Sequence, residues 1–193
     1  SQCNLHCLWC DTAYTWNFLG TEFAHRDDLP GAPKKFDRTA ETVDVSVDAL
    51  TERLISQPCR RIIFTGGEPL LQQRELGELI QNLKTFDPEF YIEIETNGTI
   101  KPIGLAAELI DQFNVSPKLA HSGNSASIRL RPEVLDFYAS DPRANFKIVV
   151  HSCPFTLANG GSCMILFSFY PQRPLSTNAP HEGVSDAHLA VPH

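Results

Sequence analysis

Three cysteines, Cys3, Cys7 and Cys10, lie within eight positions near the start of the chain, in the stretch CNLHCLWCDT. Thiolates are soft ligands that select zinc, copper(I) or iron–sulfur clusters. A structural zinc site normally takes four protein ligands, and His6 could add one, but it directly precedes Cys7, so both side chains cannot easily face one small ion. A four-iron cluster has four corners, so three thiolates leave one iron open to a substrate or cofactor.

The composition favours one globular domain without large polyanionic partners. A chain of 193 residues that is 42% hydrophobic and 20% charged can bury one sizeable core. Its net charge of -7 gives no drive toward nucleic acid or an anionic membrane. The apolar runs are far shorter than the roughly 20 residues that span a bilayer, and the start has no basic segment followed by an apolar one. We therefore predict a cytoplasmic protein.

Helical and strand patterns alternate along the body of the chain. Apolar residues at helical spacing predict helices at residues 47–58, 76–83, 105–110 and 132–138. β-rich runs predict strands at residues 61–65, 91–96, 113–116 and 146–150. Alternating strands and helices imply right-handed crossovers and a parallel sheet, so the predicted fold class is α/β.

Three loops that follow predicted strands carry the polar and glycine-rich motifs. TGGEP follows the first strand, TNG the second and SPK the third. In parallel α/β folds, the loops that leave the carboxyl ends of the strands meet on one rim and carry the chemistry. We therefore expect these three loops to form one site.

Two glutamates of the second strand, Glu93 and Glu95, must share one face, because side chains alternate across a strand. A sheet covered on both faces would resist two buried carboxylates, whereas an open barrel with a polar lumen would accept them. The alternative is that both lie at a solvated edge or are paired with Lys or Arg.

Residues 151–193 differ from the rest of the chain. Their only charged residues are Arg173, Glu182 and Asp186, and they hold five prolines and four of the seven histidines. Because no helical or alternating period survives, we predict an irregular or poorly ordered tail after a core of residues 1–150.

Two motifs together resemble a known superfamily. Cys3-x3-Cys7-x2-Cys10 is similar to the signature of the radical S-adenosylmethionine (SAM) enzymes, whose open iron is chelated by the amino and carboxylate groups of SAM. Gly66-Gly67-Glu68-Pro69 resembles their second motif, which hydrogen-bonds the methionyl amine. The resemblance implies an incomplete, shortened (β/α) barrel.

The match narrows to one family of these enzymes. CNLHCLWCDT, TGGEPLLQ, ETNGT and SPK together resemble the 7-carboxy-7-deazaguanine synthases, over residues 3–150. The resemblance implies that Thr65 contacts the substrate and that Thr12 helps to hold Mg²⁺, a hard ion that takes oxygen ligands. It assigns a [4Fe–4S] cluster to Cys3, Cys7 and Cys10. It assigns SAM to Trp9, Cys10, Asp11, Gly67, Glu68, Ser116, Pro117 and Lys118.

The family resemblance also implies a reaction and partners. Reductive cleavage of SAM gives a 5′-deoxyadenosyl radical that abstracts hydrogen from 6-carboxy-5,6,7,8-tetrahydropterin; the ring then contracts and ammonia leaves, in queuosine and deazapurine biosynthesis. The protein orients the reactants and excludes water. The electron donor is expected to be a protein such as a flavodoxin, and the enzyme a homodimer. The family's first strand and a substrate-binding segment precede its first cysteine, so we expect them to be missing here.

Other interpretations stay open. The chain could be another radical SAM enzyme, such as an activase that places a glycyl radical on a partner protein. It could instead be a zinc-stabilised binding module that adds Cys59, Cys153 or Cys163 to the trio, or a disulfide framework. Lys118 could be an ordinary surface lysine, and Cys59 is expected to be an inert packed thiol.

Overall fold

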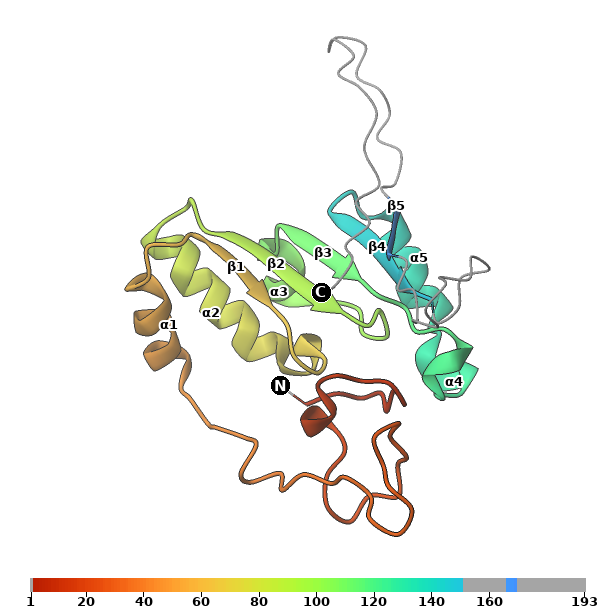
Figure 1. Cartoon of the computed structure of the whole chain (residues 1–193). Coiled ribbons are helices and arrows are strands. Elements are labelled where there is room, and N and C mark those ends of the chain that lie inside the picture. Colours follow the sequence, from red (N-terminus) through yellow and green to blue (C-terminus); the bar gives the residue numbers. More distant parts are fainter. Residues whose placement is uncertain (1, 151–165, 170–193) are drawn as a thin grey trace, which may run out of the picture.

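A five-stranded sheet forms the centre of the protein (Figure 1), in a computed structural model that describes residues 2–150 and 166–169. The strand order is β1-β2-β3-β4-β5, and the first four strands run parallel. These are β1 (Arg61–Phe64), β2 (Tyr91–Thr96), β3 (Gln112–Val115) and β4 (Ala144–Val149). The predicted α/β fold is confirmed, and four parallel strands are consistent with part of a (β/α) barrel.

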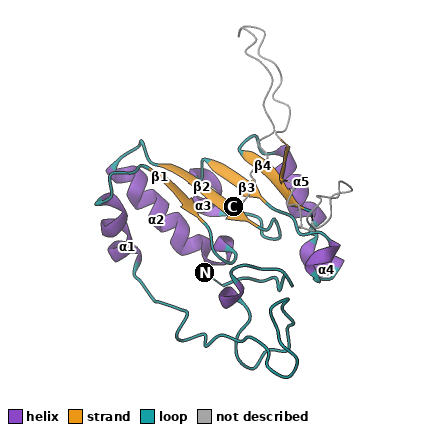
Figure 2. Ribbon diagram, viewed as in Figure 1, coloured by secondary structure: helices purple, strands orange, loops and turns teal. Residues whose placement is uncertain are grey.

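In the described ranges of the chain, five α-helices accompany the sheet, and Figure 2 shows α2 and α3 behind it. They are α1 (Val47–Ile55), α2 (Gln73–Phe86), α3 (Gly104–Leu109), α4 (Ala126–Arg129) and α5 (Pro132–Ser140). Ser46 begins α1 by accepting a hydrogen bond from the backbone N–H of Ala49 at 3.2 Å, and Pro132 occupies the first turn of α5. All four predicted helices are confirmed; the one-turn helix α4 was not predicted.

The hydrophobic core lies between the sheet and these helices. In β2, Ile92 and Ile94 are fully buried, because alternate side chains of a strand point to the same face. The amphipathic helix α2 buries Leu79, Ile80 and Leu83 in the same cluster. The later elements contribute further core residues: Ala106, Ile110, Phe113, Val115, Val134, Tyr138 and Ala144.

The opposite face of the sheet is polar. Glu93, which is 4% exposed, pairs with Arg61 and accepts hydrogen bonds from the side-chain amides of Gln112 and Asn114, each at 3.0 Å. Glu95 pairs with Lys147 of β4, whose Nζ lies 2.6 and 2.7 Å from the two carboxylate oxygens. The predicted shared face is confirmed, and a basic side chain neutralises each carboxylate.

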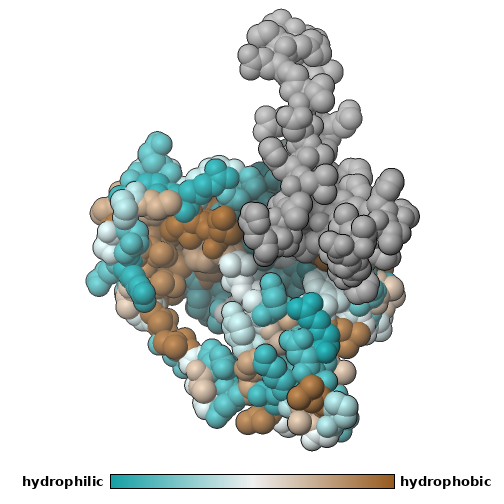
Figure 3. Space-filling view, viewed as in Figure 1, coloured by the Kyte–Doolittle hydropathy of each residue, from teal (hydrophilic) through white to brown (hydrophobic). Residues whose placement is uncertain are grey.

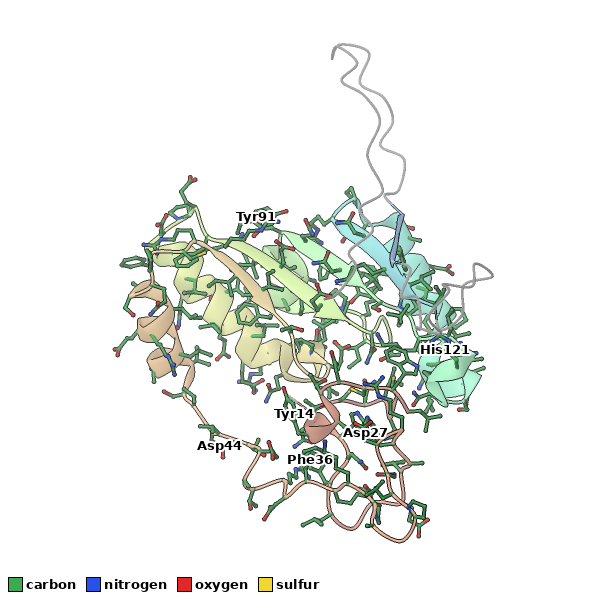
Figure 4. The ribbon with its side chains drawn as sticks, viewed as in Figure 1. Tyr14, Asp27, Phe36, Asp44, Tyr91 and His121 are labelled. Carbon is green, nitrogen blue, oxygen red and sulfur yellow. The ribbon has the colours of Figure 1, made fainter. Side chains whose placement is uncertain are left out.

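The cysteine segment and the long connection to α1 lie at the carboxyl ends of the strands, where the arrowheads of β1 and β2 point in Figure 1. Apart from the short helix η1 (Ala13–Thr15), this part is held by loop contacts. Tyr14 and Phe36 meet edge to face with ring centroids 6.2 Å apart, and Figure 4 shows both at the opposite end of the sheet from Tyr91.

One expectation is corrected, and another is tested only in part. Within the tail that was predicted to be irregular, residues Leu166–Phe169 form β5, which pairs antiparallel with β4; the other residues of 151–193, Cys153 and Cys163 included, lie outside the described part, and for them the irregular tail stays a prediction. Cys59 is exposed rather than packed, because it lies in the turn between α1 and β1, where its thiol donates to the carbonyl of Arg61 at 3.2 Å. Within the described residues, no helix is long and apolar enough to cross a membrane.

Candidate functional site

A cavity of about 260 Å³ lies where the cysteine segment meets the carboxyl ends of the strands. Most of the predicted site residues line it: Cys3, Cys7, Trp9, Cys10, Asp11, Thr12, Thr65, Gly67, Ser116 and Lys118. Glu68 and Pro117 do not line the cavity. The expected convergence of the three strand-end loops is confirmed, because the TGGEP, TNG and SPK loops each contribute to this wall.

Backbone hydrogen bonds dock the cysteine segment onto these loops. The N–H of Glu68 donates to the carbonyl of Gln2 at 2.7 Å, and the N–H of Leu8 donates to the carbonyl of Ser122 at 2.9 Å. Within the segment, the N–H of Cys10 donates to the carbonyl of Cys7 at 3.0 Å and tightens the turn between the last two cysteines. The positions of the three thiols are therefore set by main-chain contacts to the loops after β1 and β3.

The three thiols are free and partly or fully enclosed. Cys7 is 6% exposed, and Cys3 and Cys10 are half-buried. Burial raises the pKa of the Cys3 thiol and raises that of Cys7 to about 11, because a dry environment disfavours the thiolate. Binding of iron to these sulfurs must therefore displace protons at neutral pH.

The thiols surround the cavity without converging on one point. In the described part of the chain, no three His, Cys, Asp or Glu side chains are close enough together to hold one metal ion. A zinc ion needs four ligands about 2.0–2.3 Å from one centre, whereas an iron–sulfur cluster spreads its ligands over several irons. This arrangement suits a cluster better than the zinc module.

The nearby histidines are engaged elsewhere. His6 stacks on Phe23 with ring centroids 3.5 Å apart and does not line the cavity. His25 is buried, and its Nε2 lies 2.8 Å from the carbonyl oxygen of Cys10, so it holds the cysteine turn in place. Neither ring completes the ligand set of the three cysteines.

Glu68, predicted to contact SAM, is fully buried and holds the loop after β2. Its carboxylate accepts hydrogen bonds from the backbone N–H of Leu70 at 3.1 Å, the backbone N–H of Asn97 at 2.7 Å and the hydroxyl of Thr96 at 3.0 Å. Burial raises its pKa, and these donors oppose that rise. Glu68 therefore joins the TGGEP and ETNGT loops beneath the cavity wall.

Asn97 continues this connection to the cysteine segment. Its side-chain amide donates to Oδ1 of Asn4 at 2.8 Å and lies 4.0 Å from the sulfur of Cys3. Its Oδ1 accepts from the backbone N–H and the hydroxyl of Thr99, which in turn accepts from Asn4 at 2.8 Å. The polar residues of ETNGT thus fix the position of the first cysteine.

Lys118 brings a positive charge to the cavity. Its Nζ donates to the hydroxyl of Ser116 at 2.9 Å and lies 5.9 Å from the centre of the Trp9 ring. The ring of Trp9 also stacks on His121, with centroids 5.5 Å apart. Because Lys118 is half-buried in the wall, it is not an ordinary surface lysine.

Sequence reasoning missed several residues of the cavity wall. Lys147 and Val149 of β4 line it together with Glu95, and so do Thr15 and Trp16 of the cysteine segment. Strand parity was a usable signal: Phe146 packs against the core, so Lys147 must face the opposite side. No sequence pattern indicated Trp16, because only the fold of the segment turns it toward the cysteines.

Comparisons with known proteins agree with this geometry. The profile of the Radical SAM superfamily matches residues 1–139. A 7-carboxy-7-deazaguanine synthase of Pyrobaculum aerophilum is 31% identical over 77% of this chain and 54% of its own length. Proteins of the same name from Hyperthermus butylicus and Buchnera aphidicola are 26% and 32% identical over 77% and 68% of this chain, and 53% and 57% of their own lengths.

The chain thus spans about half the length of the curated relatives that it matches. The superfamily profile covers more than two thirds of the chain, including all three cysteines and the loops after β1, β2 and β3. This superfamily uses a [4Fe–4S] cluster and SAM, and the cavity lies where its cysteine motif meets the strand ends. The chain belongs to the Radical SAM superfamily.

Proposed function

We propose that this chain carries the radical core of a 7-carboxy-7-deazaguanine synthase, which converts 6-carboxy-5,6,7,8-tetrahydropterin to 7-carboxy-7-deazaguanine with loss of ammonia. One observation carries the proposal: the three cysteines and the loops after three successive strands line a single cavity. The names of the relatives support this substrate over that of a glycyl-radical activase.

The residues of the cavity suit the cluster. Cys3, Cys7 and Cys10 would hold three irons of a [4Fe–4S] cluster and leave the fourth to SAM. Trp9 and Trp16 line the same cavity, and their indole N–H groups are buried and have no hydrogen-bond partner among the described residues. An indole nitrogen can only donate, so these groups are suited to an acceptor such as a sulfide or a carboxylate. Bound together, the cluster and SAM supply one-electron, carbon-radical chemistry.

SAM carries an amine and a carboxylate, and the wall offers groups for both. We assign the binding of the SAM carboxylate to Lys118, whose charge favours anions in the cavity. The ring of Trp9 would pack against the cofactor as part of the cavity wall. Gly67, Asp11 and Ser116 would complete this end. Glu68 and Pro117 would act through the loops that they shape, because neither lines the cavity.

The other end of the cavity would hold the pterin. Thr65 would contact it beside the Glu95–Lys147 ion pair of the same cavity wall, which offers both an acceptor and a cation to a ring that bears donors and a carboxylate. Thr12 would contribute one oxygen to Mg²⁺, with the substrate carboxylate and water as further ligands. Excluding bulk water from this end would protect the radical step.

The cellular setting is part of the proposal. Four described cysteines are free thiols, which fits a reducing compartment such as the cytoplasm. A flavodoxin-like donor would deliver the electron, and the active form would be a homodimer. Adding a reduced flavodoxin in place of a chemical reductant tests the donor. Measuring the mass of the protein in solution tests the homodimer.

The decisive experiment is anaerobic reconstitution with iron and sulfide, followed by dithionite, SAM and the carboxypterin with and without Mg²⁺. We expect about four irons per chain, 5′-deoxyadenosine whose yield rises with substrate, and 7-carboxy-7-deazaguanine that requires Mg²⁺. A cluster-loaded chain that makes 5′-deoxyadenosine equally with and without the carboxypterin contradicts the substrate. A colourless chain that holds one zinc contradicts the radical chemistry altogether.

A further inference from the structure

Each of the three thiol sulfurs has a polar side chain nearby, and the contacts differ in kind. The hydroxyl of Thr12 lies 3.4 Å from Cys10, where either atom can donate. The amide of Asn97 is 4.0 Å from Cys3 and is already committed to Asn4. The side-chain Nδ2 of Asn124 lies 3.4 Å from the sulfur of Cys7. Among the described residues, Cys7 therefore has the best-formed amide donor.

Contacts on both sides hold Asn124 in this position. It is 7% exposed and lies between α4 and the turn η3 (Ala120–Ser122), whose His121 is labelled in Figure 4. Its Oδ1 accepts a hydrogen bond from the backbone N–H of His6 at 3.0 Å, and its Nδ2 lies 3.3 Å from the hydroxyl of Ser122. Its second amide hydrogen is therefore free to point at Cys7.

The orientation of the amide follows from its partners. A backbone N–H can only donate, so the atom of Asn124 that faces His6 must be the oxygen. The NH₂ group then faces Cys7 and Ser122. The backbone N–H of Leu8 donates to the carbonyl of Ser122 at 2.9 Å and holds this turn against the cysteine segment, and the lack of a side chain at Gly123 allows its close approach to Leu8.

We propose that Asn124 is a positioning residue that donates an N–H···S hydrogen bond to the Cys7 ligand and raises the reduction potential of the cluster. This proposal rests on the cluster assigned under the proposed function. Reduction adds negative charge to the cluster and its sulfurs, and a donor stabilises the more negative state more strongly. The effect is large at Cys7, because this sulfur is almost fully removed from water.

The test compares the one-electron reduction potentials of the cluster-loaded wild type and variants. Reduction is monitored through the electron paramagnetic resonance signal of the reduced cluster. Asn124→Leu removes the donor, and Asn124→Asp keeps the acceptor for His6 but places a carboxylate at the sulfur. We expect both substitutions to lower the reduction potential by at least about 59 mV, which corresponds to a tenfold change in the equilibrium constant of the one-electron reduction. Asn114→Leu, which removes a buried amide from the polar layer around Glu93, is the matched control and should leave the potential unchanged.

Each outcome decides the question. Unchanged potentials in both Asn124 variants at full iron content overturn the proposal. If both variants fold by circular dichroism but take up no iron, Asn124 builds the site rather than tuning it, and the proposal is again overturned. A wild-type chain that binds the cluster but does not turn over the carboxypterin contradicts the proposed function alone, since the potentials can still be compared.

Discussion

Gly67 is needed where the two sequence motifs meet. A Cβ added to this residue would overlap with the carbonyl group of Gln2 and lie 2.6 Å from the backbone nitrogen of Cys3. Both neighbours are backbone atoms that cannot rotate away, and the next residue, Glu68, donates to Gln2 at this point. A glycine here therefore has a steric role in addition to any contact with the cofactor.

Gly67→Ala should push the cysteine segment away from β1. We expect a loss of about 1–3 kcal/mol in the free energy of unfolding, typical of overpacking, and a large fall in iron content after reconstitution. Denaturant unfolding and an iron assay measure the two effects. Gly31→Ala is the control: its φ of +73° strains an alanine, but nothing lies within 4 Å, so iron uptake should survive. Equal iron content in both variants would contradict this steric role.

At the scale of elements, the sheet separates two environments by side-chain parity. In β2 and β3, Ile92, Ile94, Phe113 and Val115 face the helices, and Glu93, Gln112 and Asn114 face the other way and form a polar layer. At the β1 edge the sheet presents apolar surface, including Ile63 at 52% exposure, within a face where Figure 3 shows hydrophobic residues in brown. The polar face stays stable because Glu93 has a cation and two amide partners and Glu95 has a cation.

The start of β4 is anchored by a second ion pair. Arg143 donates to both carboxylate oxygens of Asp141, at 3.0 and 2.7 Å, and to the carbonyl of Ile110 at 2.8 Å. Its guanidinium carbon also lies 5.1 Å from the centre of the Phe113 ring. The hydrogen bonds that Arg143 donates to Asp141 lower the pKa of Asp141 and raise the pKa of Arg143, so both shifts indicate the same favourable interaction.

A group with a lowered folded-state pKa stabilises the protein above its unfolded pKa, and this contribution is lost as pH falls through the folded pKa. We therefore expect Asp141→Asn to lower the free energy of unfolding by about 1 kcal/mol at pH 7, the value for a partly exposed pair. The difference from wild type should stay constant down to about pH 5 and shrink below about pH 4. Urea unfolding across this range measures it, with the exposed Asp136→Asn as control. A difference that grows toward low pH would contradict the sign.

At the scale of the whole molecule, the cysteine segment and its long connection to α1 contribute little to the main hydrophobic core. Leu5, Ala13 and Trp16 are buried, yet none belongs to the cluster between sheet and helices. Docking of this part depends on a few loop hydrogen bonds and on aromatic contacts such as that between Trp9 and His121. A ligand bound by the three thiols should therefore strengthen the attachment of this segment.

Cluster loading should raise thermal stability through ligand linkage. At a hundredfold excess over the dissociation constant the gain is about 2.7 kcal/mol, or about 5–10 °C in Tm for a chain of this size. Anaerobic circular dichroism melts of the loaded and iron-free wild type measure it. The Cys3→Ser, Cys7→Ser, Cys10→Ser triple variant should melt with the iron-free protein whether or not iron and sulfide are added; a rise in this variant would contradict binding through the trio.

The sequence was sufficient to predict the motifs and most of the elements. Period and turn residues correctly placed four helices and four strands, because each signal is local and repeats over several residues. The order of motifs after strands placed the site on the carboxyl rim, since parallel strands end at the same edge. Strand β5 was missed because its four residues give too short a pattern and pair only with the distant β4.

The tertiary structure alone decided which side chains share the cavity and which support it. Glu68, a residue of the TGGEP motif, is buried beneath the cavity wall and does not line it. Lys147, a strand residue that no motif indicated, lines the cavity. Asn124 reaches Cys7 across 117 positions of sequence. Such contacts depend on how separate elements pack in space, and no local spacing records that, whereas the cysteine trio and the strand–loop order are written within short stretches of chain.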